Sequence, residues 1–184
     1  MANLTAKTNT SQLAVVDMQA KLSGAMPAEA MQAAARNCGI LAQAANALNV
    51  PIVVTEQYPQ GLGATMPEIS QYFGNVKPIA KTAFSACGEP KFNQQLHRDI
   101  PQIVLVGMEA HICVLQTALD LLLQGKQVFV VEDALISRNP ENKANALARL
   151  RSASCVISNT ESALFEWLGD ANHEAFKALS KLIR

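Results

Sequence analysis

The chain has 184 residues, and fifteen Lys and Arg residues balance fifteen Asp and Glu residues. This balance argues against a general nucleic-acid binder or a protein that docks on anionic membranes. The length suits one domain over 1–184, and a chain of this size should bury roughly 70% of its unfolded surface, so it needs no disulfide or metal to fold. Residues 1–10 lack an apolar signal segment and are expected to form a flexible N-terminus.

Four scattered cysteines indicate a reducing compartment. They show neither C-x-x-C nor Cys/His ligand spacing, so metal binding is not expected. Cys38, Cys87 and Cys155 lie in apolar settings, which favour buried thiols that act as small hydrophobic side chains. We therefore expect a cytoplasmic protein, and no apolar run is long enough to cross a membrane.

Short apolar runs alternate with helical patterns along the chain. Residues 57–75 are rich in Pro and Gly and are expected to form an irregular loop, and 160–184 a C-terminal helical tail. The alternation predicts an α/β fold in three layers, with a six-stranded, mostly parallel, Rossmann-like sheet and helices on both faces. The expected strands are 13–16, 52–55, 78–80, 103–106, 128–131 and 155–158, and the expected helices are 27–48, 92–97, 113–124, 140–152, 162–168 and 174–183.

Residues 103–114 carry the strongest chemical signal. An apolar strand is broken by Gly107, and Cys113 follows on the first turn of a long helix. Backbone N–H groups and the helix dipole at such a position favour the thiolate over the thiol. Cys113 is therefore a candidate nucleophile, although a buried structural thiol is the simpler interpretation of a lone cysteine on a helix.

Ligands in an open α/β sheet bind at the carboxyl ends of the strands. Asp17, Lys81 and Cys113 follow three different strands and form a coherent set, because a cysteine nucleophile needs a base and a counter-charge. Asp17 as a turn cap and Lys81 as a surface lysine remain alternatives. The other polar residues after strands are Glu56, Asp133 and Asn159, with Asp133 interpreted as a cap of the turn at 137–139.

Other catalytic patterns are weaker. His111 stands two residues from Cys113, and helical residues at that spacing do not face each other. The chain has no HExxH motif, no GxGxxG after the first strand and no P-loop. Ser85, Ser137 and Arg138 are candidate polar groups of a pocket, without a ranking among them.

Three segments resemble the isochorismatase-like superfamily of cysteine hydrolases. They are AVVDMQ at 14–19, KTAFS at 81–85 and GMEAHICVLQTALDL at 107–121, within a similarity that covers about 12–158. Residues 131–138 and 168–171 resemble the isochorismatase-domain-containing subgroup. The resemblance implies that Asp17 is the base, Lys81 the supporting cation and Cys113 the nucleophile.

The same resemblance implies a non-proline cis peptide at Met108–Glu109 and oxyanion donors from the backbone N–H groups of Glu109, Ala110 and Cys113. Two departures from the family are informative. Nicotinamidases carry an Asp-x-His-x-His metal site where this chain has EQYPQ at 56–60, without a histidine. True isochorismatases lack the cysteine, so its presence favours amide or related acyl chemistry.

The sequence therefore predicts a metal-independent cysteine hydrolase that cleaves a small amide-like C–N substrate through a thioester. Gln19, Tyr58 and Phe84 are expected to line the pocket. We expect no cofactor, no nucleic-acid or membrane partner, and a homo-oligomer, either a dimer or a tetramer. Two alternatives stay open. One is a non-catalytic scaffold or binding protein that retains the triad. The other is a thiol-redox protein that uses Cys113, which lacks a resolving cysteine nearby in sequence but which Cys87 could approach in space.

Overall fold

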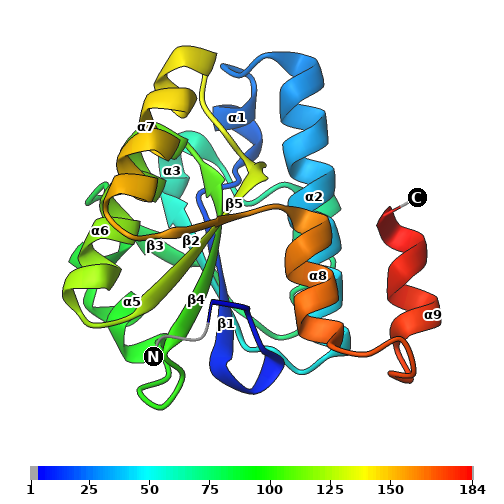
Figure 1. The fold of residues 1–184 in the computed structure, drawn as a ribbon. Coiled ribbons are helices and arrows are strands. Elements are labelled where there is room, and N and C mark those ends of the chain that lie inside the picture. Colours follow the sequence, from blue (N-terminus) through cyan, green and yellow to red (C-terminus); the bar gives the residue numbers. More distant parts are fainter. Residues whose placement is uncertain (1–3, 184) are drawn as a thin grey trace.

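The structure is a computed structural model that describes residues 4–183, and these residues form one six-stranded sheet (Figure 1). All neighbouring strands pair in parallel in the order β3-β2-β1-β4-β5-β6, which confirms the predicted α/β class. The strands are β1 (Ser11–Val16), β2 (Ile52–Gln57), β3 (Ile79–Lys81), β4 (Gln102–Met108), β5 (Gln127–Ile136) and β6 (Val156–Ser158).

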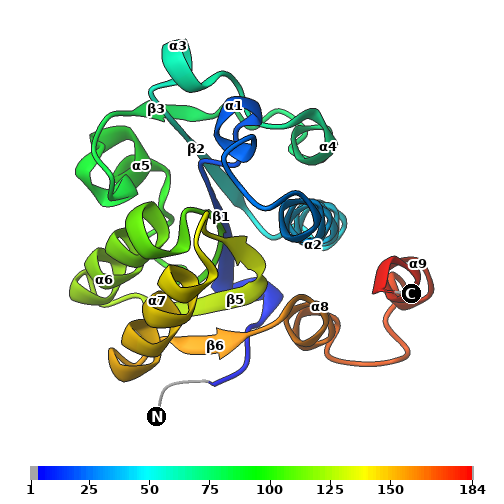
Figure 2. The same ribbon diagram turned by 90° about the horizontal axis from the view of Figure 1, so that it is seen from above.

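Helices cover both faces of the sheet, as the view from above shows (Figure 2). One face carries α1 (Ala20–Ser23), α2 (Ala28–Ala47), α4 (Pro67–Ser70) and α8 (Thr160–Leu168). The other carries α5 (Pro90–Gln95), α6 (Leu115–Leu123) and α7 (Pro140–Ser152). At the edges lie α3 (Pro59–Leu62), beside β3, and α9 (Phe176–Leu179), beyond α8. Short turns of other helix types are Thr8–Thr10, Ala86–Gly88, Ala110–Val114 and Ser180–Ile183.

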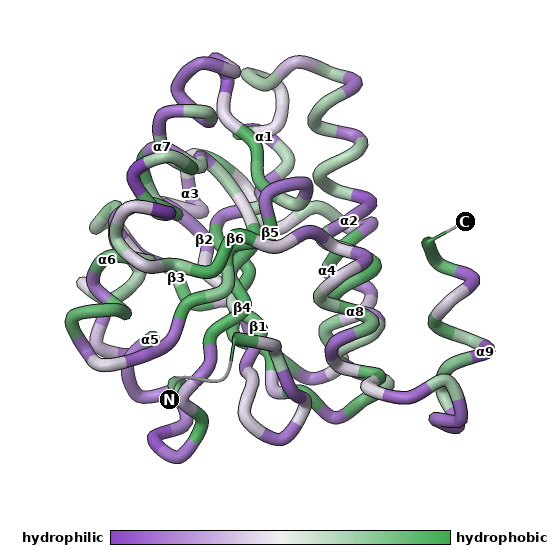
Figure 3. Tube along the Cα trace, viewed as in Figure 1, coloured by the Kyte–Doolittle hydropathy of each residue, from purple (hydrophilic) through white to green (hydrophobic). Residues whose placement is uncertain are grey.

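The core lies on both sides of the central strands. Every residue of β1 and β4 is buried, and the hydrophobic colour is concentrated along the strands in Figure 3. Parallel strands covered on both faces need such continuous apolar runs. This explains why the strands could be recognised as unbroken apolar segments of the sequence.

Local signals account for the best-predicted helix. The Asn139 side chain accepts a hydrogen bond from the N–H of Glu141, and Pro140 occupies the first helical position. Both features are favoured at a helix start. The observed bounds of α7, Pro140–Ser152, match the prediction.

Several boundaries differ from the prediction. β5 runs to Ile136 rather than ending at Val131, because Leu135 and Ile136 pair with Gly107 and Met108 of β4. The loop at 57–75 contains α3 and α4, each with a proline at its start. The last helix is shorter than expected: α9 ends at Leu179 and a 3₁₀ turn follows.

Parts of the N-terminal segment contact the rest of the chain, whereas Leu4 is largely exposed, and a flexible 1–10 stays a prediction. Ala6 is buried and its N–H donates to Glu166 Oε2 at 2.7 Å. The N–H of Lys7 donates to the Gln102 side chain. Residues 1–3 lie outside the described residues.

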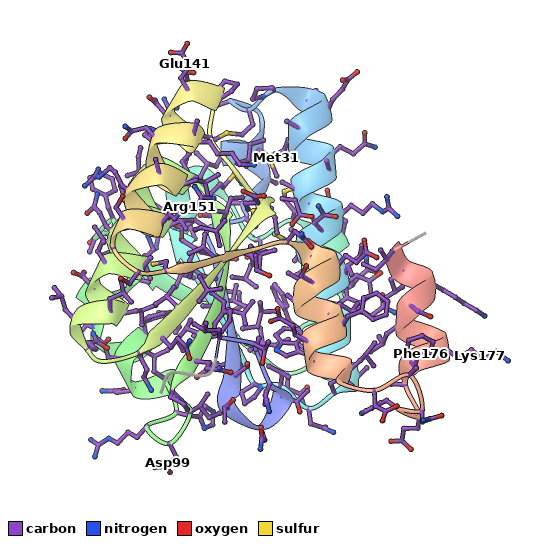
Figure 4. The ribbon with its side chains drawn as sticks, viewed as in Figure 1. Met31, Asp99, Glu141, Arg151, Phe176 and Lys177 are labelled. Atoms are coloured by element: carbon purple, nitrogen blue, oxygen red, sulfur yellow. The ribbon has the colours of Figure 1, made fainter. Side chains whose placement is uncertain are left out.

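The aromatic residues of the C-terminal segment pack largely within the chain. Trp167 is buried, and the rings of Phe165 and Phe176 meet edge-on with centroids 6.0 Å apart. Phe176 points from α9 toward α8, whereas Lys177 points away (Figure 4). Self-association therefore stays a prediction. Within residues 4–183 no helix combines the length and apolarity needed to cross a membrane.

Candidate active site

The sheet order places the candidate residues at the carboxyl-terminal edge of one sheet. The strand order reverses between β1 and β4, and ligands of open α/β sheets bind at the carboxyl ends of strands at such a switch point. Asp17 follows β1, Lys81 ends β3, and Cys113 lies in the turn after β4. The structure therefore brings together the three residues that the sequence analysis selected.

Asp17 is fully buried and firmly held. Its backbone adopts a left-handed φ of 55°, and its N–H donates to the carbonyl of Thr55 at 3.1 Å. The Thr55 hydroxyl donates to Asp17 Oδ1 at 2.8 Å. Among the described residues, Oδ2 has no hydrogen bond and is engaged only by an ion pair with Lys81. Oδ2 is therefore the carboxylate oxygen that faces the Lys81 ammonium.

Lys81 is the buried cation of the site. Its Nζ lies 2.7 Å from Asp17 Oδ2, and neither side chain is exposed to solvent. Nζ also donates to Gln57 Oε1 at 2.6 Å and to the carbonyls of Ala83 and Phe84. A buried ammonium is stable only when it is paired and hydrogen-bonded in this way. The interpretation of Lys81 as a surface lysine is thus excluded.

Gly107 lets β1 and β4 approach closely beneath the site. It pairs with Val16, the residue before Asp17, at a φ of +129°. A Cβ atom on residue 107 would overlap the backbone of Val16. Only glycine fits this conformation and this distance, so Gly107 fixes the spacing between the Asp17 segment and the segment that leads to Cys113.

Cys113 lies in a π-helical turn, Ala110–Val114, that leads into α6. The carbonyl of Glu109 accepts hydrogen bonds from the N–H groups of Ile112 and Val114 at the start of this turn. Single π turns occur often at functional sites. The turn replaces the regular helical start that the sequence suggested.

The resting state of Cys113 is the thiol, contrary to the expectation from a helix start. Burial and, to a smaller extent, the negative charge of Asp17 together raise the pKa of Cys113 to about 12, although the charge of Lys81 lowers it. Hydrogen bonding of the thiol to Asp17 contributes in the same raising sense. Burial and a neighbouring carboxylate therefore outweigh the helix dipole here.

Glu109 anchors the nucleophile turn to the segment after β5. Its carboxylate is buried and accepts hydrogen bonds from the N–H of Arg138 and from the guanidinium Nε. Burial would raise the pKa of Glu109, but the hydrogen bonds and charge of Arg138 more than offset this and hold it below the usual range. The peptide bond Met108–Glu109 is cis. Arg138 thus acts on Glu109 rather than as a free pocket group.

The three expected pocket residues differ in position. Tyr58 and Phe84 are more than half exposed, at 55% and 57%. Gln19 is fully buried. Its amide oxygen accepts from the N–H of Gln57, and its NH₂ group donates to the carbonyls of Gln57 and Gly63. Gln19 therefore supports the loop after β2 rather than lining a substrate pocket, since its polar atoms are already occupied.

The remaining polar candidates have structural partners. Ser85 donates to Asp120 Oδ2 at 2.6 Å, and the Ser137 hydroxyl lies 3.0 Å from His111 Nδ1. Glu56 accepts from Thr65. Asp133 lies within β5 and accepts from the N–H and hydroxyl of Thr160, so it caps α8 rather than the turn at 137–139. Asn159 caps α8 as well.

Sequence reasoning missed Thr55 and Gln57. Each contacts a charged group of the site, but neither belongs to a residue class that marks a catalytic centre by itself. A polar residue in an otherwise apolar strand was the available signal for Thr55. For Gln57, its place at the end of the second strand was the only indication.

Two further observations define what surrounds the site. A cavity of about 730 Å³ lies along α2, lined among others by Met31, Ile40 and Tyr72, and none of the candidate catalytic residues reaches it. Its lining combines apolar side chains with polar ones such as Arg36 and Glu68, and no cysteine is among the described residues that line it. Residues 4–183 contain no cluster of three or more His, Cys, Asp or Glu residues able to hold a metal ion.

Comparison with known proteins gives concordant results. The family model described as Isochorismatase domain matches residues 11–162. Isochorismatase domain-containing protein 2 from Bos taurus is 44% identical over 142 residues, which cover 76% of this chain and 68% of the relative.

Two solved structures are similar over nearly the whole chain. One, described as a MAR1 ribonuclease from Caenorhabditis elegans, has a TM-score of 0.92 and 34% identity, and covers 97% of this chain and 92% of the other. The other, YcaC from Pseudomonas aeruginosa with hexane-2,5-diol and covalent acrylamide, has a TM-score of 0.87 and 25% identity, with 100% and 97% covered. The chain belongs to the isochorismatase domain family.

Proposed function

We propose that this protein is a cysteine hydrolase that cleaves a small amide-type C–N substrate, without a metal, through a thioester on Cys113. One observation carries the proposal. The Cys113 thiol interacts with both members of a buried Asp17–Lys81 ion pair, and Asp17 Oδ2 has no hydrogen bond among the described residues beside that ion pair. A thiol, a base and a cation in one dry site are the elements of covalent acyl transfer.

In the proposed acylation, Asp17 takes the proton of Cys113 as Sγ attacks the carbonyl carbon. The carbonyl π electrons move to oxygen, and backbone N–H groups of Glu109, Ala110 and Cys113 would stabilise that oxyanion. The C–N bond then breaks, and the leaving amine takes the proton from Asp17. Backbone donors aimed at a developing oxyanion commonly contribute about 3–4 kcal/mol.

In the proposed deacylation, Asp17 removes a proton from water as the water oxygen attacks the thioester carbonyl. The C–S bond breaks, the carboxylic acid leaves, and Cys113 recovers its proton from Asp17. Lys81 keeps its charge throughout and lowers the energy of the negative charge that moves between Asp17 and Cys113. The thiol therefore needs to ionise only in contact with substrate, which fits its raised pKa.

The exposed aromatic rings of Tyr58 and Phe84 suit the entrance of such a site. Phe84 lies in the loop whose carbonyl accepts from Lys81, and Tyr58 follows Gln57, the other acceptor. Large apolar side chains left exposed near a reactive centre are typical of substrate contact. We propose that both rings contact the apolar part of the substrate.

A relative supports reactive chemistry in this fold. YcaC from Pseudomonas aeruginosa, at 25% identity, is described as carrying covalent acrylamide. Acrylamide is itself a small amide and an electrophile, so a covalent adduct requires a nucleophile in that protein.

Cleavage of RNA is a second candidate, because a structure at 34% identity is described as a MAR1 ribonuclease. Lys81 is buried, hydrogen-bonded to three oxygens and ion-paired with Asp17, so it offers no exposed cation to a phosphate backbone. The balanced net charge points in the same direction. Amide hydrolysis is therefore the proposal that the site favours.

The test combines both activities on one preparation. A panel of small primary amides is assayed for ammonia release, and a labelled single-stranded RNA for cleavage. We expect turnover of at least one amide by the wild type and by Cys87→Ala, and its loss in Cys113→Ala. RNA cleavage that survives in Cys113→Ala, with no amide turned over, would contradict the proposal and favour a scaffold or a different enzyme.

A further inference from the structure

The Lys81 ammonium donates to three acceptors, as many as it has protons, and forms an ion pair with Asp17 Oδ2 as well. Asp17 Oδ2 lies at 2.7 Å, Gln57 Oε1 at 2.6 Å, and the carbonyls of Ala83 and Phe84 at 3.1 and 3.0 Å. An ammonium carries three N–H donors. The acceptors around it therefore determine its position, and Gln57 Oε1 is the nearest of them.

The Gln57 amide is held so that its oxygen faces Lys81. Its Nε2 donates to the carbonyl of Thr82 at 2.8 Å, which leaves Oε1 for the ammonium. Thr82 directly follows Lys81, so one amide binds both the charged end of Lys81 and the adjacent backbone. Rotation of the amide would break both bonds and place its NH₂ group against a cation.

The backbone of Gln57 is fixed in turn by Gln19. The N–H of Gln57 donates to Gln19 Oε1 at 2.7 Å, and its carbonyl accepts from Gln19 Nε2 at 3.0 Å. Gln19 is fully buried and stands two residues after Asp17. A continuous set of amide hydrogen bonds thus connects the Asp17 segment to the Lys81 ammonium.

We propose that Gln57 is a positioning residue for Lys81, supplying a neutral acceptor that directs the ammonium to Asp17, with Gln19 holding Gln57 in place. The neutrality of the amide matters. A carboxylate at position 57 would give Lys81 two anions and place more negative charge beside Cys113. The amide holds the cation and leaves its charge for the Asp17–Cys113 pair, a role that rests on the proposed function of these three residues.

The test measures Cys113 directly and needs no substrate. The rate of Cys113 alkylation by iodoacetamide is followed by peptide mass spectrometry at pH 8 and 9. Cys155 is equally buried, so its alkylation rate reports any general opening of the fold in each variant. The variants are Gln57→Met, which removes the acceptor, and Gln57→Glu, which restores it with a charge. Gln12→Met is the matched control, because both amide atoms of Gln12 are hydrogen-bonded, as those of Gln57 are, but Gln12 lies at the opposite end of β1 from Asp17.

We expect alkylation of Cys113, relative to Cys155, to fall at least threefold in Gln57→Met, because a displaced Lys81 stabilises the thiolate less. In Gln57→Glu we expect a fall of at least tenfold, since each added pKa unit lowers the thiolate fraction tenfold. Gln12→Met should keep the wild-type ratio. Unchanged ratios in both Gln57 variants would overturn the proposal, even if their thermal stability drops. Absence of amide turnover in the wild type would contradict the proposed hydrolase activity, but the alkylation ratios would still test the role of Gln57.

Discussion

Lys81 Nζ lies 2.7 Å from Asp17 Oδ2, and both side chains are completely shielded from solvent. Two full charges are therefore held in the interior, beside a cysteine that remains protonated. Such a pair is costly to build and is expected where charge must move during a reaction.

The first prediction concerns the energetic coupling of this pair. Asp17→Asn and Lys81→Met should each lower the free energy of unfolding by about 3–5 kcal/mol, because each leaves one buried charge without its partner. The double variant should be destabilised by at least about 2 kcal/mol less than the sum. Urea unfolding of the four proteins measures the coupling, and strict additivity would show that the two charges do not interact.

The second prediction concerns the pKa of Cys113. Burial and the charge of Asp17 raise this pKa to about 12, so Asp17→Asn should lower it and Lys81→Met should raise it. At pH 8, iodoacetamide should alkylate Cys113 at least about tenfold faster in Asp17→Asn than in the wild type, and more slowly in Lys81→Met. Half-buried Cys87 serves as the reference thiol in each protein. Slower alkylation in Asp17→Asn would contradict the assignment of Asp17 as the group that keeps the thiol protonated.

The third prediction concerns Arg138 and pH. The folded-state pKa of Glu109 is lowered, so the stability that this carboxylate contributes is present above its unfolded pKa of about 4.3 and is lost as pH falls through the folded value. Arg138→Ala should thus cost about 2 kcal/mol at pH 7 and progressively less as the pH falls below about 4.3. Arg149→Ala, at an exposed position of α7, is the matched control. A destabilisation that does not depend on pH would show that Arg138 acts through packing alone.

The fourth prediction concerns the close approach of β1 and β4. Gly107→Ala should destabilise the protein by about 3 kcal/mol or more, because the added methyl meets the backbone of Val16. Gly125→Ala is the control, since residue 125 also has a positive φ but open space around its Cβ position. Its cost should be about 1–2 kcal/mol. Equal thermal stability of the two variants would refute this explanation of Gly107.

The sequence predicted the sheet well because buried parallel strands are unbroken apolar runs, and it predicted α7 because Asn139 and Pro140 mark its start locally. It failed at β5, where Glu132 and Asp133 interrupt the apolar pattern. Asp133 is exposed at the point where the register of β4 and β5 shifts, and Thr160 at the start of α8 donates two hydrogen bonds to it. A contact between segments 27 residues apart is not visible in a local pattern.

In the candidate site too, local sequence patterns predicted some features, and others depend on contacts that form only in the folded chain. Asp17, Lys81 and Cys113 could be selected because reactive residues after parallel strands meet at one sheet edge. The predicted protonation state of Cys113 was wrong, because its pKa depends on burial and on the charge of Asp17. Only the folded chain buries Cys113 and places it beside Asp17. Gln19 and Gln57 were assigned other roles or none, because the partner of an amide is set by three-dimensional geometry.

The most direct test of the thioester mechanism is the mass of Cys113 during turnover. A reaction with an amide substrate is quenched in acid within milliseconds, and the peptide that contains Cys113 is analysed by mass spectrometry. We predict that this peptide carries the acyl group of the substrate, that the adduct disappears with hydroxylamine, and that Cys87 stays unmodified. Turnover of the amide with no acyl group on Cys113 at any quench time, or with full activity in Cys113→Ala, would contradict the proposed mechanism.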